Sequence, residues 1–311
     1  MKITVIGTIN KDLILPFGKA PIESFGGIFY DIAILATLYP NAEIIPVSYV
    51  GEDVLPTIHA ILDKMPNVSR KGFIHSPEKN HKVILEYQSP TRRKEKSLFH
   101  FPSLTWEQIS PFSESDMIIV NMITGWDIEP EAYLQLSAIA KERMYLDIHF
   151  LTMAADEFGQ RTPQIPENLS AWLSGSKFVQ MNEDEYQLLA QKSRSEVDFF
   201  QQYFDDEQIL FITQGAKGVL MLYERDGLIG QREYPGYKIS RLIDTTGCGD
   251  AFGAAFVSCY LQFGDLFAAV EHANLVAGAN TMLKGTNEME LLEEKMKMLK
   301  STNAVKIRQN E

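Results

Sequence analysis

The chain has 311 residues, a formal net charge of -12 and a sequence pI of about 5.1. This acidic balance argues against a nucleic-acid-binding protein, whose footprint is usually basic. It does not exclude an anionic ligand, because a local nest of backbone amides binds phosphate on an acidic protein. The two cysteines, Cys248 and Cys259, are too few for a disulfide framework and favour a reducing compartment.

No long apolar segment follows the first residues, and no run of about 18 uncharged apolar residues occurs anywhere in the chain. We therefore expect no signal peptide, no transmembrane helix and a cytoplasmic location. Hydrophobic residues make up 45% of the chain, which is ordinary for a globular protein and sufficient for a core without metal or disulfides.

Apolar runs and turn residues predict an alternation of strands and helices in the first half. We expect strands at residues 2–8 and 42–50, and helices at residues 28–39 and 54–64. Residues 81–88 and 97–101 interrupt this alternation as a β pair that forms a small separate sheet. The charged run at residues 92–96 between them is interpreted as a solvated loop tip.

The alternation resumes after residue 115 and becomes mainly helical after residue 248. Strands are expected at residues 116–121, 144–150, 176–181, 208–213, 219–223 and 228–234. Helices are expected at residues 129–141, from residue 183, and at residues 250–263, 266–283 and 289–299. Such an alternation predicts a mostly parallel sheet that is covered by helices on both faces.

The strongest chemical signal lies in the segment Asp244-Thr245-Thr246-Gly247-Cys248-Gly249-Asp250. Its glycines let backbone amides approach a ligand closely, and it opens a predicted helix whose first amides lack internal partners. Together with the helix dipole, these amides suit an anion such as a transferring phosphoryl group. A carboxylate beside that anion is repelled by it, and accepting a proton from an attacking hydroxyl would explain its presence. The alternative is an ordinary helix start with an acidic first turn, and local chemistry leaves both readings open.

This segment resembles the C-terminal signature of the ribokinase-like family, also called the PfkB carbohydrate kinases, which is usually Asp-Thr-x-Gly-Ala-Gly-Asp. The resemblance implies that the amides of Gly247, Cys248 and Gly249 form an anion hole and that Asp250 is the catalytic base. Cys248 stands where the family has Ala, so we expect it to contribute its amide while its thiol fills space.

Other segments match the family's substrate motifs in the family's order, so that the resemblance spans roughly the whole chain. The segment at residues 7–12 resembles the turn after the first strand, which implies that Asn10 and Asp12 lie at the substrate. Gly26, Gly27 and Asp31 resemble the substrate motif Gly-Gly-x-x-x-Asn.

The nucleotide side matches as well. Asn182 and Glu185 resemble Asn-x-x-Glu, which implies that Glu185 helps to hold Mg²⁺ through water. The resemblance also implies nucleotide contacts for the residues of the Thr-x-Gly-x-x-Gly turn, for the signature threonine and for an asparagine near the adenine: Thr213, Gly215, Gly218, Thr246 and Asn274.

Taken alone, each of these short motifs has a plainer explanation. Gly26-Gly27 suits a turn, Asp12 a solvated loop, and Asn182 to Glu185 a helix cap. Gly215 and Gly218 suit a hairpin connection. Their ordered occurrence favours the family.

Two further positions depart from the family pattern. Asp31 stands where the family has Asn, and an ionised Asp accepts hydrogen bonds but does not donate them. We therefore expect Asp31 to bind acceptor hydroxyls and to favour a neutral polyol, sugar or nucleoside over a sugar phosphate or a sugar acid. The alternative is a polar residue at a helix start. The segment Asp147-Ile148-His149 stands where the family often has Asp-x-Asn after the middle strand. We interpret His149 as structural, or as a support for residues of the site, rather than as catalytic.

The resemblance implies an α/β fold, a Rossmann-like three-layer α/β/α sandwich of ribokinase-like type with a small β lid. One kinase domain would span residues 1–311, with lid segments near residues 11–25 and 80–104. It implies ATP and Mg²⁺ as cofactors, leaves a monovalent cation open, and makes a homodimer through the lid plausible.

The expected activity is transfer of the ATP γ-phosphoryl group to a hydroxyl of a sugar or related polyol. Nucleic acid and membrane are not expected as partners. A nucleoside kinase of the same family is the first alternative, with Phe25, Phe29 or Tyr30 stacking on the base. A non-catalytic ligand-binding member of the family is the second.

Overall fold

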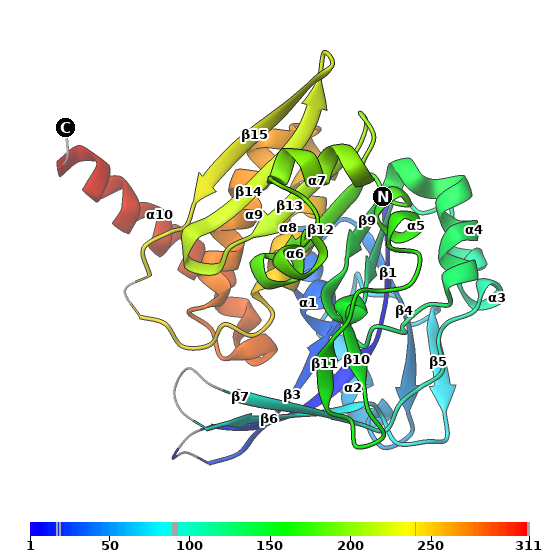
Figure 1. Cartoon of the computed structure of the whole chain (residues 1–311). Helices are drawn as coiled ribbons and strands as arrows, with labels where there is room; N and C mark the ends of the chain where they lie inside the picture. The colour runs from blue at the N-terminus through cyan, green and yellow to red at the C-terminus, as the bar shows by residue number, and fades with distance from the viewer. Residues whose placement is uncertain (17, 19, 89–92, 240, 310–311) are drawn as a thin grey trace.

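A mixed sheet forms the middle layer of the molecule in this computed structural model, which describes residues 1–16, 18, 20–88, 93–239 and 241–309. In that part of the chain nine strands are ordered β15-β14-β13-β12-β9-β8-β1-β4-β5 (Figure 1). They are β1 (Lys2–Ile6), β4 (Glu43–Gly51), β5 (Phe73–Ser76), β8 (Met117–Asn121), β9 (Met144–Asp147), β12 (Phe178–Asn182), β13 (Ile209–Thr213), β14 (Gly218–Arg225) and β15 (Leu228–Pro235). Neighbouring strands run parallel from β5 to β13, and β14 and β15 are added antiparallel.

Helices cover both faces of this sheet. One face carries α1 (Phe29–Leu38), α2 (Leu55–Leu62), α8 (Cys248–Phe263), α9 (Leu266–Asn280) and α10 (Leu292–Gln309). The other carries α3 (Trp106–Ile109), α4 (Pro130–Ala140), α5 (Leu169–Ser174), α6 (Glu183–Leu189) and α7 (Glu196–Tyr203). Short 3₁₀ turns occupy Ser110–Phe112, Lys141–Arg143, His149–Thr152, Gly215–Lys217 and Gly285–Leu291. No helix in the described ranges has both the length and the apolar character needed to span a bilayer.

The central strands are apolar along their whole length because both of their faces are covered. Every residue of β8 is buried. Two successive residues of this strand, Ile118 and Ile119, pack into the hydrophobic cores on opposite faces of the sheet. Continuous apolar runs of this kind are typical of parallel strands between two helical layers. The three-layer α/β sandwich expected from the sequence is confirmed.

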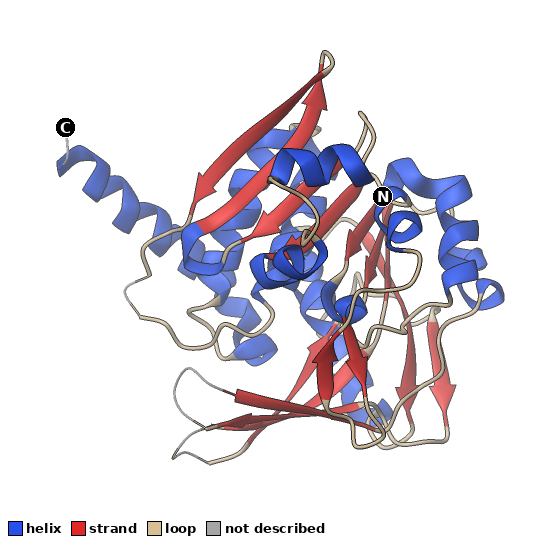
Figure 2. Cartoon of the chain, viewed as in Figure 1, coloured by secondary structure: helices blue, strands red, loops and turns tan. Residues whose placement is uncertain are grey.

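A second sheet lies at one end of the molecule (Figure 2). Its order is β3-β2-β6-β7, with β2 (Ile9–Leu15), β3 (Ile22–Gly27), β6 (Lys82–Tyr87) and β7 (Arg93–Leu98). These strands fall in or beside the two ranges expected for a lid. Within those ranges Phe17, Lys19 and residues 89–92 lie outside the described residues.

The interpretation of residues 92–96 as a solvated tip is wrong for residues 93–96, and Arg92 lies outside the described residues. Residues 93–96 belong to β7 and pair with β6 in antiparallel register. At the edge of the four-stranded sheet, a strand can carry exposed charges such as Lys94 and Lys96 because one of its sides has no neighbour in that sheet.

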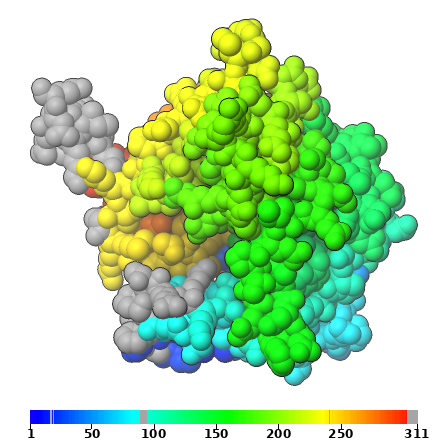
Figure 3. All heavy atoms as spheres, in the orientation of Figure 1, coloured from blue at the N-terminus to red at the C-terminus, as the bar shows by residue number. Residues whose placement is uncertain are grey.

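Another part of the chain also differs from the expectation. The strand expected at residues 144–150 ends at Asp147, because a turn follows in which His149 has a positive φ of 31°. After this turn come β10 (Met153–Ala155) and β11 (Arg161–Pro163), a hairpin that was not predicted. Its connection lies beside β7, through a bridge between Lys96 and Gln160 and a bond from the Ser97 amide to the Gly159 carbonyl. In Figure 3 the green surface of this hairpin meets the cyan surface of β6 and β7.

Two glycines bound α8, and both have the left-handed conformation, with φ of 72° at Gly247 and 68° at Gly264. They differ in their surroundings. A Cβ added at Gly247 would lie 2.3 Å from the ring of Tyr30, whereas one at Gly264 would meet nothing within 4 Å. Gly247 therefore allows the start of α8 to pack directly on α1.

We expect Gly247→Ala to lower the free energy of unfolding more than Gly264→Ala does. Both substitutions carry the strain of a left-handed alanine, about 1–2 kcal/mol. Only the first also overpacks against Tyr30, which typically costs about 1–3 kcal/mol more. Urea unfolding of the two variants and the parent measures the difference, and equal losses would contradict this account of the α1–α8 contact.

Candidate active site

Polar side chains gather at the carboxyl ends of four neighbouring parallel strands. Asn121, Asp147, Asn182 and Thr213 are the last residues of β8, β9, β12 and β13. Carboxyl ends of parallel strands meet at the same edge of a sheet, and Asn121 pairs with Asp147 and Asn182 with Thr213 in register. The strand order departs from the chain order at β1, since β4 lies on one side and β8 on the other. In open α/β sheets, ligands bind outside such a point.

The N-terminus of α8 reaches this edge and places Asp250 there. The helix begins directly after Gly247, whose carbonyl accepts from the Ala251 amide at 2.8 Å. Asp250 is the third residue of the helix and is 8% exposed. The Gln180 side chain of β12 donates to the Gly249 carbonyl at 3.1 Å, which fixes the first turn against the sheet.

One buried amide joins Asp250 to Asp31 of α1. The Asn121 Nδ2 donates to the Asp250 Oδ1 at 2.7 Å and to the Asp31 Oδ2 at 3.0 Å. Sequence reasoning missed Asn121, although a single polar residue at the end of a fully apolar strand is a usable signal for a site.

The electrostatic environment of these carboxyls is unusual. Burial raises the pKa of Asp250 above its ordinary value and that of Asp31 well above its ordinary value, and the nearby Asp250 adds to the rise at Asp31. No lysine or arginine forms an ion pair with either carboxyl in the part of the chain that the structure describes. The raised pKa disfavours the ionised Asp31 on which the expectation was based, because that expectation assumed a solvated carboxylate. Its direct contact with an acceptor stays a prediction.

A second buried network lies beside the first. Asp147 accepts from the Gln180 Nε2 at 2.7 Å, and the Tyr145 hydroxyl donates to the Gln180 Oε1 at 2.5 Å. Burial, with further contributions from Glu185 and Asp250, raises the pKa of Asp147 well above its ordinary value. Gln180 was also missed, and its signal was a polar residue within the apolar strand β12.

Asn182 and Glu185 form a reciprocal cap at the start of α6. The Glu185 amide donates to the Asn182 Oδ1 at 2.9 Å, and the Asn182 amide donates to the Glu185 Oε2 at 2.7 Å. The helix-cap reading is thus correct as geometry. A cap alone does not account for the environment of Glu185, since burial raises the pKa of its carboxyl to about 7. A carboxyl in this condition suits a cation that would favour its charged form.

The segments expected at the nucleotide converge at the end of β13. Gly215 and Gly218 have φ of 56° and 109° and shape the connection from β13 to antiparallel β14, so the hairpin reading also holds. Any Cβ at Gly218 would meet the Tyr234 carbonyl at 2.0 Å. The Asn274 side chain donates to the Pro235 carbonyl at 2.9 Å, which brings α9 to the same place.

The residues expected at the acceptor line one face of the small sheet. Asn10 and Asp12 alternate along β2 and pair with Gly26 and Ser24 of β3. The side chains of Asn10, Asp12 and Ser24 are buried, although they are polar. Within the described residues the Asn10 Oδ1 and the Ser24 Oγ have no hydrogen-bond partner. Gly27 follows on β3, and a Cβ there would lie 2.2 Å from the Thr8 carbonyl.

Arg161 of β11 was not predicted and ties the hairpin to this region. Its guanidinium lies 4.8 Å from the ring centroid of Trp126 and 4.7 Å from that of Phe150. It donates to the Thr124 carbonyl at 2.5 Å and to the Ser97 Oγ of β7 at 3.3 Å. The large sheet's loops and the small sheet therefore share one partly buried cation.

The start of the signature segment is held by local hydrogen bonds. The Thr246 amide and hydroxyl donate to the Asp244 Oδ1 at 2.9 Å and 2.8 Å, and its carbonyl accepts from the Asn280 side chain at 3.1 Å. The same Asn280 amide lies 3.6 Å from the Cys248 sulfur. Burial raises the pKa of the Cys248 thiol to about 12.

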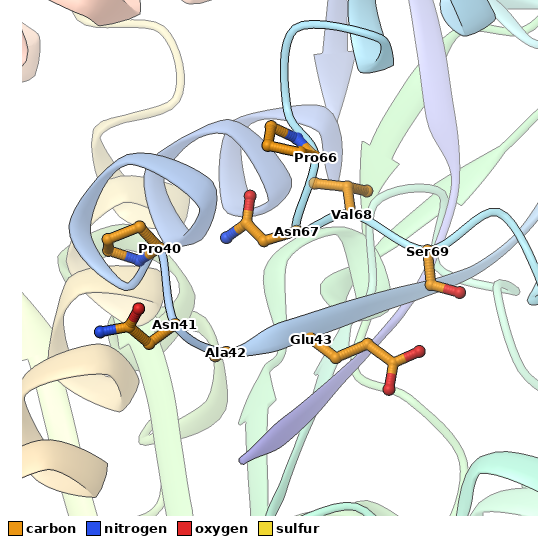
Figure 4. A pocket seen from close by; sticks show the side chains of 8 residues that line it. All are labelled: Pro40, Asn41, Ala42, Glu43, Pro66, Asn67, Val68 and Ser69. Carbon is orange, nitrogen blue, oxygen red and sulfur yellow. The ribbon is translucent and has the colours of Figure 1, made fainter.

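A separate cavity of about 420 Å³ lies far from this site along β4, beside its first residue Glu43 (Figure 4). Its lining consists of Pro40, Asn41, Ala42, Glu43, Pro66, Asn67, Val68 and Ser69. The candidate site lies at the opposite, carboxyl edge of the sheet.

Comparison with protein families decides the classification. The model of the pfkB family of carbohydrate kinases matches residues 80–293, which is more than half of the chain. The chain belongs to this family. The expected resemblance is confirmed.

Individual relatives are similar over shorter stretches. The chain is 33% identical to the nucleoside kinase of Methanocaldococcus jannaschii over 109 residues, 35% of this chain and 34% of that protein. It is 36% identical to the deoxyribokinase of Salmonella typhi over 77 residues, 25% and 24% of the two chains. It is 34% identical to the ATP-dependent ribose-1-phosphate kinase of Halopiger xanaduensis over 86 residues, which are 28% of this chain and 27% of that protein. These matches span about a third or less of each relative.

Solved structures extend the likeness to nearly the whole fold. A pyrophosphate-dependent kinase in the ribokinase family superposes with a TM-score of 0.74 at 17% identity, covering 94% of this chain and 99% of the other. The ribokinase of Thermotoga maritima gives 0.73 at 18% identity, covering 96% and 99%. The ribokinase-like architecture of this family member is therefore confirmed.

We expect Cys248→Ala to keep the wild-type fold and to leave any turnover supported by this site within about threefold. The turn presents backbone amides, and alanine has the same amide with less bulk, while the lost sulfur contact with Asn280 is weak and long. Steady-state kinetics together with thermal unfolding check this. A folded but inactive variant would show that the thiol has a role of its own.

Proposed function

We propose that this protein is an ATP-dependent kinase that transfers the γ-phosphoryl group to a hydroxyl of a sugar or related polyol. The observation that carries the proposal is the position of Asp250. Its buried carboxyl lies in the first turn of α8, at the edge of the sheet where the parallel strands end. It lies beside the first amides of the helix, which have no partner within the helix.

In the proposed reaction, the acceptor hydroxyl forms a bond to the γ-phosphorus while the bond to the β-phosphate oxygen breaks. Asp250 takes the proton of that hydroxyl, and the amides of Gly247, Cys248 and Gly249 bind the charge of the moving group. Burial supports this role, because a base with a raised pKa binds a proton more readily. Catalysis of phosphoryl transfer consists mainly of such positioning and charge stabilisation.

On the donor side we propose that Thr213, Gly215, Gly218 and Asn274 approach ATP, with Thr246 at the phosphates. The convergence of these segments at the end of β13 supports the assignment. The half-buried carboxyl of Glu185 would order water molecules on Mg²⁺. When bound, Mg²⁺ would neutralise part of the phosphate charge. Asn182 would hold Glu185 in place through the reciprocal cap. A monovalent cation remains an open addition.

On the acceptor side we propose that the four-stranded sheet is a lid and that residues 1–311 act as one domain. Asn10, Asp12, Gly26 and Gly27 would orient the acceptor. The Asn10 Oδ1, which has no hydrogen-bond partner among the described residues, supports this because it can accept a hydrogen bond from a hydroxyl. That two copies of the chain form a homodimer through the lid stays a prediction, which light scattering can test. Since burial favours neutral Asp31, the argument that its charge repels a sugar phosphate no longer applies.

A nucleoside kinase is the second candidate, and Phe25 favours it. Of the three aromatic side chains considered for base stacking, Phe29 and Tyr30 are buried and Tyr30 packs below Gly247. Phe25 is only partly buried and contacts Phe29 with a centroid distance of 5.6 Å. It therefore remains the aromatic that a base could reach. The alternative of a non-catalytic ligand-binding protein predicts no turnover with any acceptor.

Asp250→Asn should lower turnover by about 10²–10⁴-fold, the usual contribution of a positioned general base, while ATP binds nearly as before. The assay follows phosphoryl transfer to a panel of sugars, polyols, nucleosides and sugar phosphates, with ATP and pyrophosphate as separate donors. Near-wild-type turnover in the variant, with a productive acceptor, would remove Asp250 from the reaction. A folded wild-type protein without turnover across the panel would favour the non-catalytic alternative.

Glu185→Gln should raise the Mg²⁺ concentration needed for half-maximal activity, because a neutral amide orders metal-bound water less strongly than a carboxylate. Asp184→Asn is the matched control, since it removes the same charge from an exposed neighbour in the same helical turn. Mg²⁺ titrations at fixed ATP give the comparison. An unchanged requirement in Glu185→Gln would leave this residue as a helix cap alone.

A further inference from the structure

A single amide group holds two carboxyls at the centre of the site. Asn121 is fully buried, and its Nδ2 donates one hydrogen bond to Asp250 and one to Asp31. An amide nitrogen has two hydrogens, so these two bonds use its whole donating capacity. The two carboxyls together thus set the orientation of Asn121. Because they share this one amide, a change at either carboxyl affects how the other is held.

The position of Asp31 gives it no other evident route to the reaction. Its side chain lies on α1 and is 1% exposed, less than those of Asn10, Asp12 and Asp250. A contact with bound acceptor would require uncovering it. A contact with the base already exists, through Asn121.

The surrounding charges constrain the protonation of the pair. The groups that interact electrostatically with Asp31 are Asp250 of α8 and the two β9 residues Asp147 and Tyr145. Asp250 in turn interacts with His149, Glu185, Tyr30 and Cys248. Asp147 and Glu185 add acidic groups around the pair, and burial removes solvation from each charge. A charge on both Asp31 and Asp250 is therefore strongly disfavoured. Asp250 is the more exposed of the two and lies at the helix N-terminus, which favours its charged form.

We propose that Asp31 is a positioning residue for the base: in its neutral, protonated form it shares the Asn121 amide with Asp250 and holds that carboxylate in place without adding a second charge. This proposal rests on the proposed function. It is an alternative to the acceptor contact expected from the sequence, because Asp31 would act through the base and not through the acceptor.

The test is a double-mutant cycle with Asp31→Leu and Asn121→Leu, which replace each polar group by an apolar one of similar size. Each single change should lower kcat by about 10²-fold, the typical cost of misplacing a reacting group, with the acceptor KM within about twofold. The double variant should be no slower than the slower single variant, because both changes break the same unit. Effects that multiply, or a loss that appears in the acceptor KM, would overturn the proposal.

Asp31→Asn provides the conservative variant. A neutral amide oxygen still accepts from Asn121, so kcat should return to within about threefold of the wild-type value, and the acid limb of the kcat profile should not move. If Asp31 were charged, removing its charge would lower the pKa of Asp250 and move the acid limb to lower pH. Such a shift would contradict the neutral form, and this measurement decides the question even if the leucine variants do not fold.

The failure of this proposal and that of the proposed function can be told apart. Asp250→Asn is measured in the same assay, with thermal unfolding to show that each variant is folded. Retained turnover in Asp250→Asn would refute the base itself. Loss of turnover there, together with multiplying effects of Asp31→Leu and Asn121→Leu, would refute only the positioning role.

Discussion

The site depends on how the N-terminus of α8 is held against the carboxyl edge of the sheet. Two side-chain amides hold it: Asn121 bonds to the Asp250 carboxyl, and Gln180 bonds to the Gly249 carbonyl. Tyr30 of α1 supports the turn from below, at a distance that only glycine at position 247 permits. The proposed anion site at the first amides of the helix and the proposed base, Asp250, are therefore fixed by the same contacts.

These contacts place several acidic groups together without a lysine or arginine ion pair to Asp31, Asp147 or Asp250 in the described part of the chain. The pKa values of all three carboxyls are raised, although His149 opposes the rise at Asp250. Buried charges are normally paired, and strongly shifted carboxyls cluster at functional sites. In the proposed reaction, Mg²⁺ would favour the charged form of Glu185 and of its neighbours. The site also needs a way to limit its own charge, which a protonated Asp31 provides.

Sequence reasoning correctly placed the features that depend on backbone conformation and local pattern. The glycine turn before Asp250, the Asn182–Glu185 cap and the strand–helix alternation are all local, and each occurs in the structure close to its expected place. It failed where a property arises from packing between distant segments. The bond from Asn121 to Asp31 spans 90 residues and that to Asp250 spans 129, so neither the partner nor the charge of Asp31 was readable locally. The hairpin β10–β11 was missed for a related reason, since its strands have three residues each and its connection lies against β7.

The most direct test of the account is a crystal structure of the chain with a non-hydrolysable ATP analogue and Mg²⁺. The account predicts that the terminal phosphate lies at the amides of Gly247, Cys248 and Gly249, with the Asp250 carboxyl facing it and still bonded to Asn121. A terminal phosphate bound elsewhere, with the α8 N-terminus empty, would contradict the central claim that this helix start is the phosphoryl-transfer site.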